Sequence, residues 1–199
     1  INNISYLKSF LKKERKTTSV ALVGPGAGNN TKTMKFTEEI LKYIKYVILD
    51  ADALNSFKNK TKKLLKYLDK YRLITPHKAE FHRLFPTIKK SLENKEKVLK
   101  FLKLCDSNIL LKGNTTLIGS NKKIIKNSHS SSELAVIGSG DVLAGIIVSL
   151  VGDNKMSMIE AAAAGAWLHG DIAKKNGRGL ISEDLIKGIP SALKRLKNE

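Results

Sequence analysis

Cysteine is almost absent from this chain of 199 residues, since Cys105 is the only one. No disulfide can therefore form within the chain, and a reducing compartment such as the cytoplasm is expected. The leucines around Cys105 indicate a buried structural thiol rather than a nucleophile. No apolar run approaches the length of a membrane span. The first residues, 1–4, carry neither an initiator methionine nor a signal-peptide pattern, and they read as the interior of a longer protein.

Arginine and aromatic residues are also scarce, although the formal net charge is +18. Only 5 of the 36 basic residues are arginines, and aromatics make up 6% of the chain. Arginine is the residue that reads bases and grips phosphate in a bidentate way, and aromatic rings stack on bases. The charge alone would suggest a basic nucleic-acid binder. We interpret it instead as lysine enrichment of solvated faces, which excludes specific nucleic-acid recognition and leaves only non-specific attraction to polyanions.

Apolar strands alternate with helical patterns along the chain, which predicts an α/β fold in a single domain covering residues 1–199. No internal repeat and no domain boundary is evident. Alternating apolar residues on both sides of 119–121 predict a β-hairpin. A serine-rich loop follows at 127–137. The strands are expected at 19–23, 46–49, 71–74, 108–111, 115–118 and 122–125, and the helices at 4–16, 31–43, 61–69, 78–85, 91–104, 139–151, 156–174 and 183–197.

Polar and glycine residues follow the ends of four predicted strands, at 24–28, 50–55, 75–77 and 112–116. Ligands bind at the carboxyl edge of open α/β sheets, so these turns are expected to meet at one cleft. The 24–28 turn, Gly-Pro-Gly-Ala-Gly, lets the backbone approach a ligand closely, although a plain tight turn explains it equally well, and it does not match the dinucleotide fingerprint. Asp50 and Asp52 are suited to bind Mg²⁺, or one of them caps the following turn; both readings stay open.

Two further turns add chemistry to this edge. His77 stands at a strand end beside Glu80, which favours ligand contact, although a lone histidine is more often structural. Lys112 is followed by a glycine and by two hydroxyls, a set that suits a nucleotide phosphate or ribose without Walker spacing. His169, on a helix face of small residues, is expected as a packed core residue, and Ser182 as the N-cap of the last helix.

The strongest motif is Gly138-Ser139-Gly140-Asp141, where a glycine-rich turn runs directly into an apolar helix. Unpaired N–H groups at a helix N-terminus carry partial positive charge and form an anion site. Asp141, in the first turn, is then placed to act as a base beside a bound phosphate. An anion cradle with a base is a reasonable minimum for phosphoryl transfer.

Taken in order, these motifs resemble the ADP- or ATP-dependent NAD(P)H-hydrate dehydratase family. The resemblance rests on Asp-Ala-Asp-Ala-Leu-Asn followed by Thr-Pro-His, on Gly-Ser-Gly-Asp, and on Trp167-Leu168-His169-Gly170. It runs from about residue 19 to residue 193. It implies a ribokinase-like three-layer α/β/α fold with a mostly parallel sheet, the repair of hydrated NADH or NADPH with ADP or ATP and Mg²⁺, and a homo-oligomer.

The resemblance also implies roles for individual residues. Asp141 is the catalytic base that deprotonates the substrate hydroxyl, and elimination of phosphate then restores the nicotinamide double bond. The metal residues remain those considered above, Asp50 and Asp52. The residues implied to contact the hydrated cofactor are Gly24, Gly26, Gly28, His77 and Asp141. Those implied to contact the adenine nucleotide are Lys112, Gly113, Asn114, Thr115, Thr116, Ser139 and Gly140.

The chain departs from the family pattern in three places, of which Ala79, where the family commonly has glycine, is a mild one. Val136-Ile137 stands where the family usually has Thr-Gly, so Ile137 is expected to weaken phosphate binding or to wall off the site. The family's first strand and its glycine- and alanine-rich helix have no counterpart here, so an N-terminally truncated member with an exposed sheet edge is expected. Two alternatives therefore stay open. They are a small-molecule kinase of the ribokinase superfamily and a catalytically silent fragment that acts as a binding module.

Overall fold

The computed structural model describes residues 3–14, 20–121 and 123–196 and contains a six-stranded sheet. The strands are β1 (Val20–Val23), β2 (Tyr46–Leu49), β3 (Arg72–Ile74), β4 (Asn108–Leu111), β5 (Thr116–Ser120) and β6 (Lys123–Asn127), and they lie in the order of the chain. β1 to β4 are parallel, whereas β5 and β6 form the expected antiparallel hairpin. The hairpin strands are longer than predicted, and Gly119 lies inside β5 rather than in the turn.

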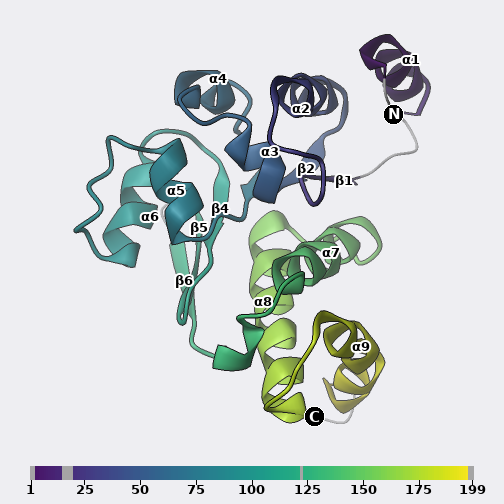
Figure 1. Ribbon diagram of the computed structural model, residues 1–199, viewed down its shortest axis with the longest axis vertical. Helices are drawn as coiled ribbons and strands as arrows, with labels where there is room; N and C mark the ends of the chain where they lie inside the picture. Colours follow the sequence, from purple (N-terminus) through teal and green to yellow (C-terminus); the bar gives the residue numbers. More distant parts are fainter. Residues whose placement is uncertain (1–2, 15–19, 122, 197–199) are drawn as a thin grey trace.

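Helices cover both faces of this sheet (Figure 1). They are α1 (Ile4–Glu14), α2 (Thr31–Tyr43), α3 (Ala51–Asn55), α4 (Thr61–Leu65), α5 (Lys78–Leu84), α6 (Asn94–Leu102), α7 (Ser139–Gly152), α8 (Met158–Asn176) and α9 (Ser182–Leu196), with the 3₁₀ turn η1 (Ser132–Leu134) in the serine-rich loop. The prediction missed α3 and made α4 and α6 too long. The predicted residues 15, 16, 19, 122 and 197 lie outside the described part of the chain.

Alternating strand residues build two separate cores, because successive side chains of a strand point to opposite faces. Leu49 and Ile74 face a core shared with α2, α3, α5 and α6. Ile48 and Leu73 face the other core, which α7 and α8 complete. A third cluster joins α7 and α8 to α9. The three-layer α/β/α arrangement and the mostly parallel sheet are therefore confirmed.

α7 and α8 pack closely against each other. A Cβ at Gly165 of α8 would lie 2.8 Å from a side-chain carbon of Ile147 in α7, so glycine is required for this approach. α7 itself contacts β1 and β2. None of the helices in the described ranges is long and apolar enough to cross a membrane.

Candidate active site

The turns that follow β1 to β4 lie side by side, as the sequence predicted. The parallel pairing continues past the strand ends, because the N–H of Asp50 donates to the Val23 carbonyl and the N–H of Thr75 to the Leu49 carbonyl, both at 3.0 Å. Lys112, after β4, pairs with His77 in an isolated parallel bridge. The four polar turns therefore form one continuous edge.

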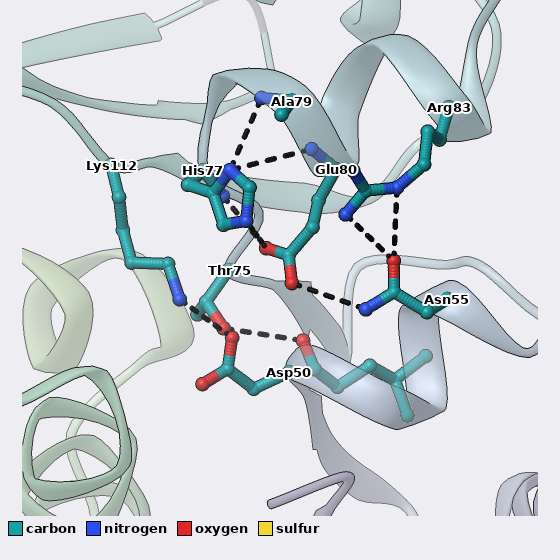
Figure 2. A network of polar contacts seen from close by, with 9 residues as sticks. Asp50, Asn55, Thr75, His77, Ala79, Glu80, Arg83 and Lys112 are labelled. Carbon is teal, nitrogen blue, oxygen red and sulfur yellow. Dashed lines mark hydrogen bonds and ion pairs between the residues drawn. The ribbon is translucent and has the colours of Figure 1, made fainter. Parts of the chain in front are cut away.

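A buried ion pair joins two of these turns. Figure 2 shows the side chains of Lys112 and Asp50 pointing toward each other. Lys112 Nζ lies 2.8 Å from Asp50 Oδ1. The Asp50 side chain is only 1% exposed, whereas that of Lys112 is 22% exposed and reaches the surface. A Cβ at Gly140 would lie 3.3 Å from Lys112 Nζ and 3.9 Å from Asp50 Oδ2. The first turn of α7 therefore lies directly against this pair, and glycine at 140 leaves the space for it.

The glycine turn after β1 is explained by its packing within the protein. Gly24 has φ of 132°, and a Cβ there would lie 1.8 Å from the carbonyl oxygen of Asp50. The N–H of Gly28 donates to Asp52 Oδ2 at 2.8 Å. A Cβ at Gly26 would meet no atom within 4 Å, so that part of the turn is open. The turn is therefore fastened to the start of α3 by Gly24 and Gly28.

The predicted metal residues, Asp50 and Asp52, both have partners within the protein. One oxygen of Asp50 is held by the Lys112 ammonium group, and one oxygen of Asp52 accepts the N–H of Gly28. A neighbouring ammonium group disfavours a cation at Asp50. Across the described ranges, no group of three or more His, Cys, Asp or Glu side chains is placed to hold a metal ion. The residues present therefore do not fit a protein-bound Mg²⁺.

His77 is the N-cap of α5. Its Nδ1 accepts the N–H groups of Ala79 and Glu80, and the Glu80 carboxylate accepts the N–H of His77, which completes a capping box (Figure 2). Asn55, at the end of α3, donates to Glu80 and accepts from Arg83. The network fastens α3 to α5. His77 thus has the structural role of a cap, while its half-exposed ring also lines the pocket described next.

A pocket of about 420 Å³ opens between the end of β4, the start of α7 and α8. It gathers six of the seven residues expected to contact the nucleotide, and His77 as well. Thr115 is the exception, because it lines a separate hollow beside the start of α6. The pocket is lined by His77, Lys112, Gly113, Asn114, Thr116, Asn127, Ser130, Leu134, Ala135, Val136, Ser139, Gly140, Leu143, Ala166 and His169.

The turn before α7 adopts its shape without the family's usual residues. Gly138 is the N-cap, with φ of 82°, a left-handed conformation that favours glycine. Ile137 is 99% exposed, so the expectation that its side chain walls off the site is wrong. Its carbonyl instead accepts the Ser182 hydroxyl. Ser182 lies in the first turn of α9 with its hydroxyl on that carbonyl, and the prediction that it caps α9 is wrong.

Asp141 lies in the first turn of α7 but does not line this pocket. It borders a second hollow of about 490 Å³, formed mostly by apolar residues of α7 and α9 such as Val142 and Ile189. Gly140, its neighbour, lines the first pocket. The start of α7 therefore separates two hollows, with its N–H groups and the Lys112 ammonium group on one side and an exposed carboxylate on the other.

His169 is the main site residue that sequence reasoning missed. It is 5% exposed, as a core residue would be, but it lines the pocket, and its Nε2 lies 3.2 Å from the Ser139 hydroxyl. Burial, together with the charge of Lys112, lowers the pKa of His169 to about 4. The ring is therefore neutral at pH 7. Sequence reasoning also gave the serine-rich loop no role in the site. In the structure one wall of the pocket is formed by Ser130, Leu134, Ala135 and Val136.

Comparison with known proteins places this geometry in a family. The sequence profile of the NAD(P)H-hydrate dehydratase family matches residues 4–191. The chain is 38% identical over 161 residues to the ADP-dependent (S)-NAD(P)H-hydrate dehydratase of Neisseria meningitidis, with 77% of this chain and 54% of that protein covered. It is 33% identical over 190 residues to the bifunctional NAD(P)H-hydrate repair enzyme Nnr of Moorella thermoacetica, covering 90% of this chain and 35% of that protein.

The chain thus spans between about a third and about a half of these two relatives. Solved structures confirm the fold. A ribokinase-like protein from Enterococcus faecalis superposes with a TM-score of 0.80 at 22% identity, covering 94% of this chain and 66% of that one. The ADP/ATP-dependent NAD(P)H-hydrate dehydratase of Bacillus subtilis gives 0.73 at 22% identity, covering 93% and 71%. With this fold, and with its motifs gathered around the start of α7, the chain belongs to the NAD(P)H-hydrate dehydratase family.

Proposed function

We propose that the chain uses an adenine nucleotide to dehydrate hydrated NADH or NADPH, and so returns damaged nicotinamide cofactor to use. The observation that carries this proposal is the pocket at the start of α7, where six residues expected to contact the nucleotide line one cavity. Membership of the family supplies the reaction. The relative from Neisseria meningitidis is named for the use of ADP.

The nucleotide phosphates are assigned to the end of the pocket where Lys112, Ser139 and Gly140 meet. The N–H groups of the first turn of α7 and the Lys112 ammonium group are the positive charges at that end. Both favour a phosphate, and both would stabilise the charge that spreads over a transferred phosphoryl group. The apolar part, at Leu134, Leu143 and Ala166, suits a base. Mg²⁺ is proposed to enter with the nucleotide phosphates, because it commonly keeps waters and binds substrate phosphates.

The hydrated cofactor is assigned to the Asp141 side of α7. The open part of the Gly24–Gly28 turn and His77, which lines the first pocket, are proposed as its further contacts. Asp141 takes the proton of the substrate hydroxyl as its oxygen attacks the terminal phosphoryl group, and the shortened nucleotide leaves. Phosphate then leaves one ring carbon and a proton leaves the neighbouring ring carbon, whose C–H electron pair becomes the carbon–carbon double bond of the nicotinamide ring. A base that works in this way contributes about 10² to 10⁴ in rate.

The test is an assay of the purified chain with hydrated NADH, Mg²⁺ and either ADP or ATP, followed by recovery of reduced-nicotinamide absorbance. We expect recovery that depends on nucleotide, and a loss of at least about 100-fold in Asp141→Asn. Asp153→Asn is the matched control, because Asp153 is an exposed aspartate just after the other end of α7. It should recover the cofactor at the wild-type rate.

Three results would contradict this function. No recovery with either nucleotide would remove the dehydratase assignment. Phosphorylation of a vitamin precursor or a sugar without recovery would identify a small-molecule kinase instead. Silence in both assays would leave a binding module. A homo-oligomer in a reducing compartment also remains a prediction, and light scattering of the purified chain tests the oligomer.

A further inference from the structure

The Trp167–Gly170 segment of α8 has no part in the proposed chemistry, yet it touches both sides of the nucleotide pocket. His169 lies inside the pocket, and Trp167 and Gly170 lie against the serine-rich loop. α8 is packed against α7 and the sheet through its small residues, so the segment has a fixed base. What it contacts is therefore held in place by the core.

On one side, His169 reaches the first residue of α7. Its Nε2 lies 3.2 Å from Ser139 Oγ, and both side chains are buried. The ring is neutral, so one of its nitrogens carries a proton and the other accepts. With the proton on Nε2, the ring donates to Ser139 Oγ, and the serine hydroxyl is left to donate its own proton. A phosphate, which only accepts hydrogen bonds at such a site, is the natural acceptor.

On the other side, Gly170 allows the serine-rich loop to lie directly on α8. A Cβ at Gly170 would lie 1.7 Å from the carbonyl oxygen of His129. The His129 ring stacks on Trp167, with centroids 5.1 Å apart and an interplanar angle of 13°, and its Nδ1 lies 3.1 Å from Lys174 Nζ. The next residue, Ser130, donates its hydroxyl to the Asn114 carbonyl. The loop is thereby fastened both to α8 and to the turn after β4.

We propose that the Trp167–Gly170 segment is a positioning element for the nucleotide pocket. His169 acts through the Ser139 hydroxyl, and Gly170 and Trp167 act through the loop wall that runs from His129 to Val136. The segment is a determinant of nucleotide affinity rather than of the chemical step. This inference rests on the proposed function, because it takes the occupant of the pocket to be ADP or ATP.

The first experiment measures the Kd of ADP and of ATP by titration calorimetry for the wild type and four variants. They are His169→Leu, His169→Gln, Ser139→Ala and the double variant His169→Leu/Ser139→Ala. We expect His169→Leu to weaken binding about tenfold, as loss of one hydrogen bond to a charged group does. Gln keeps a donor, so His169→Gln should bind within about threefold of wild type. In the Ser139→Ala background, His169→Leu should add less than about twofold.

The second experiment compares Gly170→Ala with Gly145→Ala. Both glycines lie inside helices, but a Cβ at Gly145 meets no atom within 4 Å. We expect Gly170→Ala to weaken nucleotide binding more than about tenfold, because the loop wall must move, and Gly145→Ala to bind as the wild type does. In the dehydration assay, both His169→Leu and Gly170→Ala should raise the nucleotide KM far more than they lower kcat. Circular dichroism and urea unfolding confirm that each variant is folded.

Different outcomes separate this inference from the proposed function. Wild-type binding of nucleotide that His169→Leu and Gly170→Ala leave unchanged overturns the inference alone. A tenfold effect of His169→Leu that persists without the Ser139 hydroxyl overturns the coupling to Ser139. Nucleotide binding without cofactor repair, with the variants behaving as expected, overturns only the proposed reaction. A wild-type chain that binds neither ADP nor ATP overturns both. If Gly170→Ala does not fold, the His169 series still decides.

Discussion

The ion pair between Asp50 and Lys112 should stabilise the fold in a strongly one-sided way. Replacement of Lys112 by methionine keeps the bulk of the side chain but leaves the Asp50 carboxylate 1% exposed and without its cation. Replacement of Asp50 by asparagine leaves Lys112, which is 22% exposed and already reaches water. The two single variants remove the same interaction, so any difference between them measures the cost of the charge that stays behind.

The burial of each partner sets the magnitudes. Removal of one member of a buried pair costs about 3–5 kcal/mol when the remaining charge is uncompensated, which is the case for Lys112→Met. Asp50→Asn should cost about 1–2 kcal/mol, since the ammonium group can be hydrated. The double variant should be no less stable than Asp50→Asn, because it buries no charge. The coupling energy between the two sites is then about 3–5 kcal/mol, the full cost of Lys112→Met.

Urea unfolding at pH 7 without nucleotide measures these values independently of any activity. With a slope of about 2 kcal/mol per molar, Lys112→Met should lower the midpoint by about 2 M and Asp50→Asn by less than about 1 M. Equal losses in the two single variants, or a double variant as unstable as Lys112→Met, would refute the reasoning. Either result would mean that Asp50 is solvated in solution.

Two further perturbations test the structure around this pair. Gly24→Ala should lower the free energy of unfolding in urea by about 3 kcal/mol or more, because its Cβ would overlap the Asp50 carbonyl. Gly26→Ala, with φ of 65° and open space around the Cβ, should lower it by only about 1 kcal/mol. Similar losses at both positions would contradict the turn geometry. For His169, the folded pKa of about 4 lies below the ordinary value of 6.5, so the unfolded state binds the proton first and stability falls as the pH drops from about 6.5 to 4. Between pH 7 and pH 4.5, the free energy of unfolding in urea should fall by about 2–3 kcal/mol more in the wild type than in His169→Gln. Equal losses in the two proteins would mean that His169 is not buried as described.

The sheet could be predicted because each strand is recognisable from its own short stretch of sequence. Short apolar runs such as Tyr46–Leu49 end in polar or glycine turns, and the chain order then gives the parallel edge. α3 was missed because its five residues, Ala51–Asn55, are too short to show any helical period. The polar turns that follow the strands were recognised for the same local reason, and six of the seven residues predicted to contact the nucleotide line one pocket.

The contacts that could not be predicted are those between elements that are far apart in the sequence, because they depend on how those elements pack in the fold. The partner of Asp50 is Lys112, 62 residues further along the chain, and no sequence pattern links the two. The contact of His169 with Ser139 likewise requires α8 to cross the start of α7. His77 shows the reverse case, because its cap with Glu80 is local and explains the histidine without a ligand. Side-chain partners set by packing between distant elements were therefore the ones that sequence reasoning could not find.

The start of α7 is supported by other elements rather than by its own loop, and this explains why the unusual residues before it are tolerated. Lys112 lies against Gly140, His169 contacts Ser139, and the Ser182 hydroxyl binds the carbonyl of Ile137. The side chain at 137 points into solvent, where no glycine is needed to complete these contacts. The geometry at the start of α7 is therefore a property of the packed layers, and the exposed side chain of Ile137 does not block it.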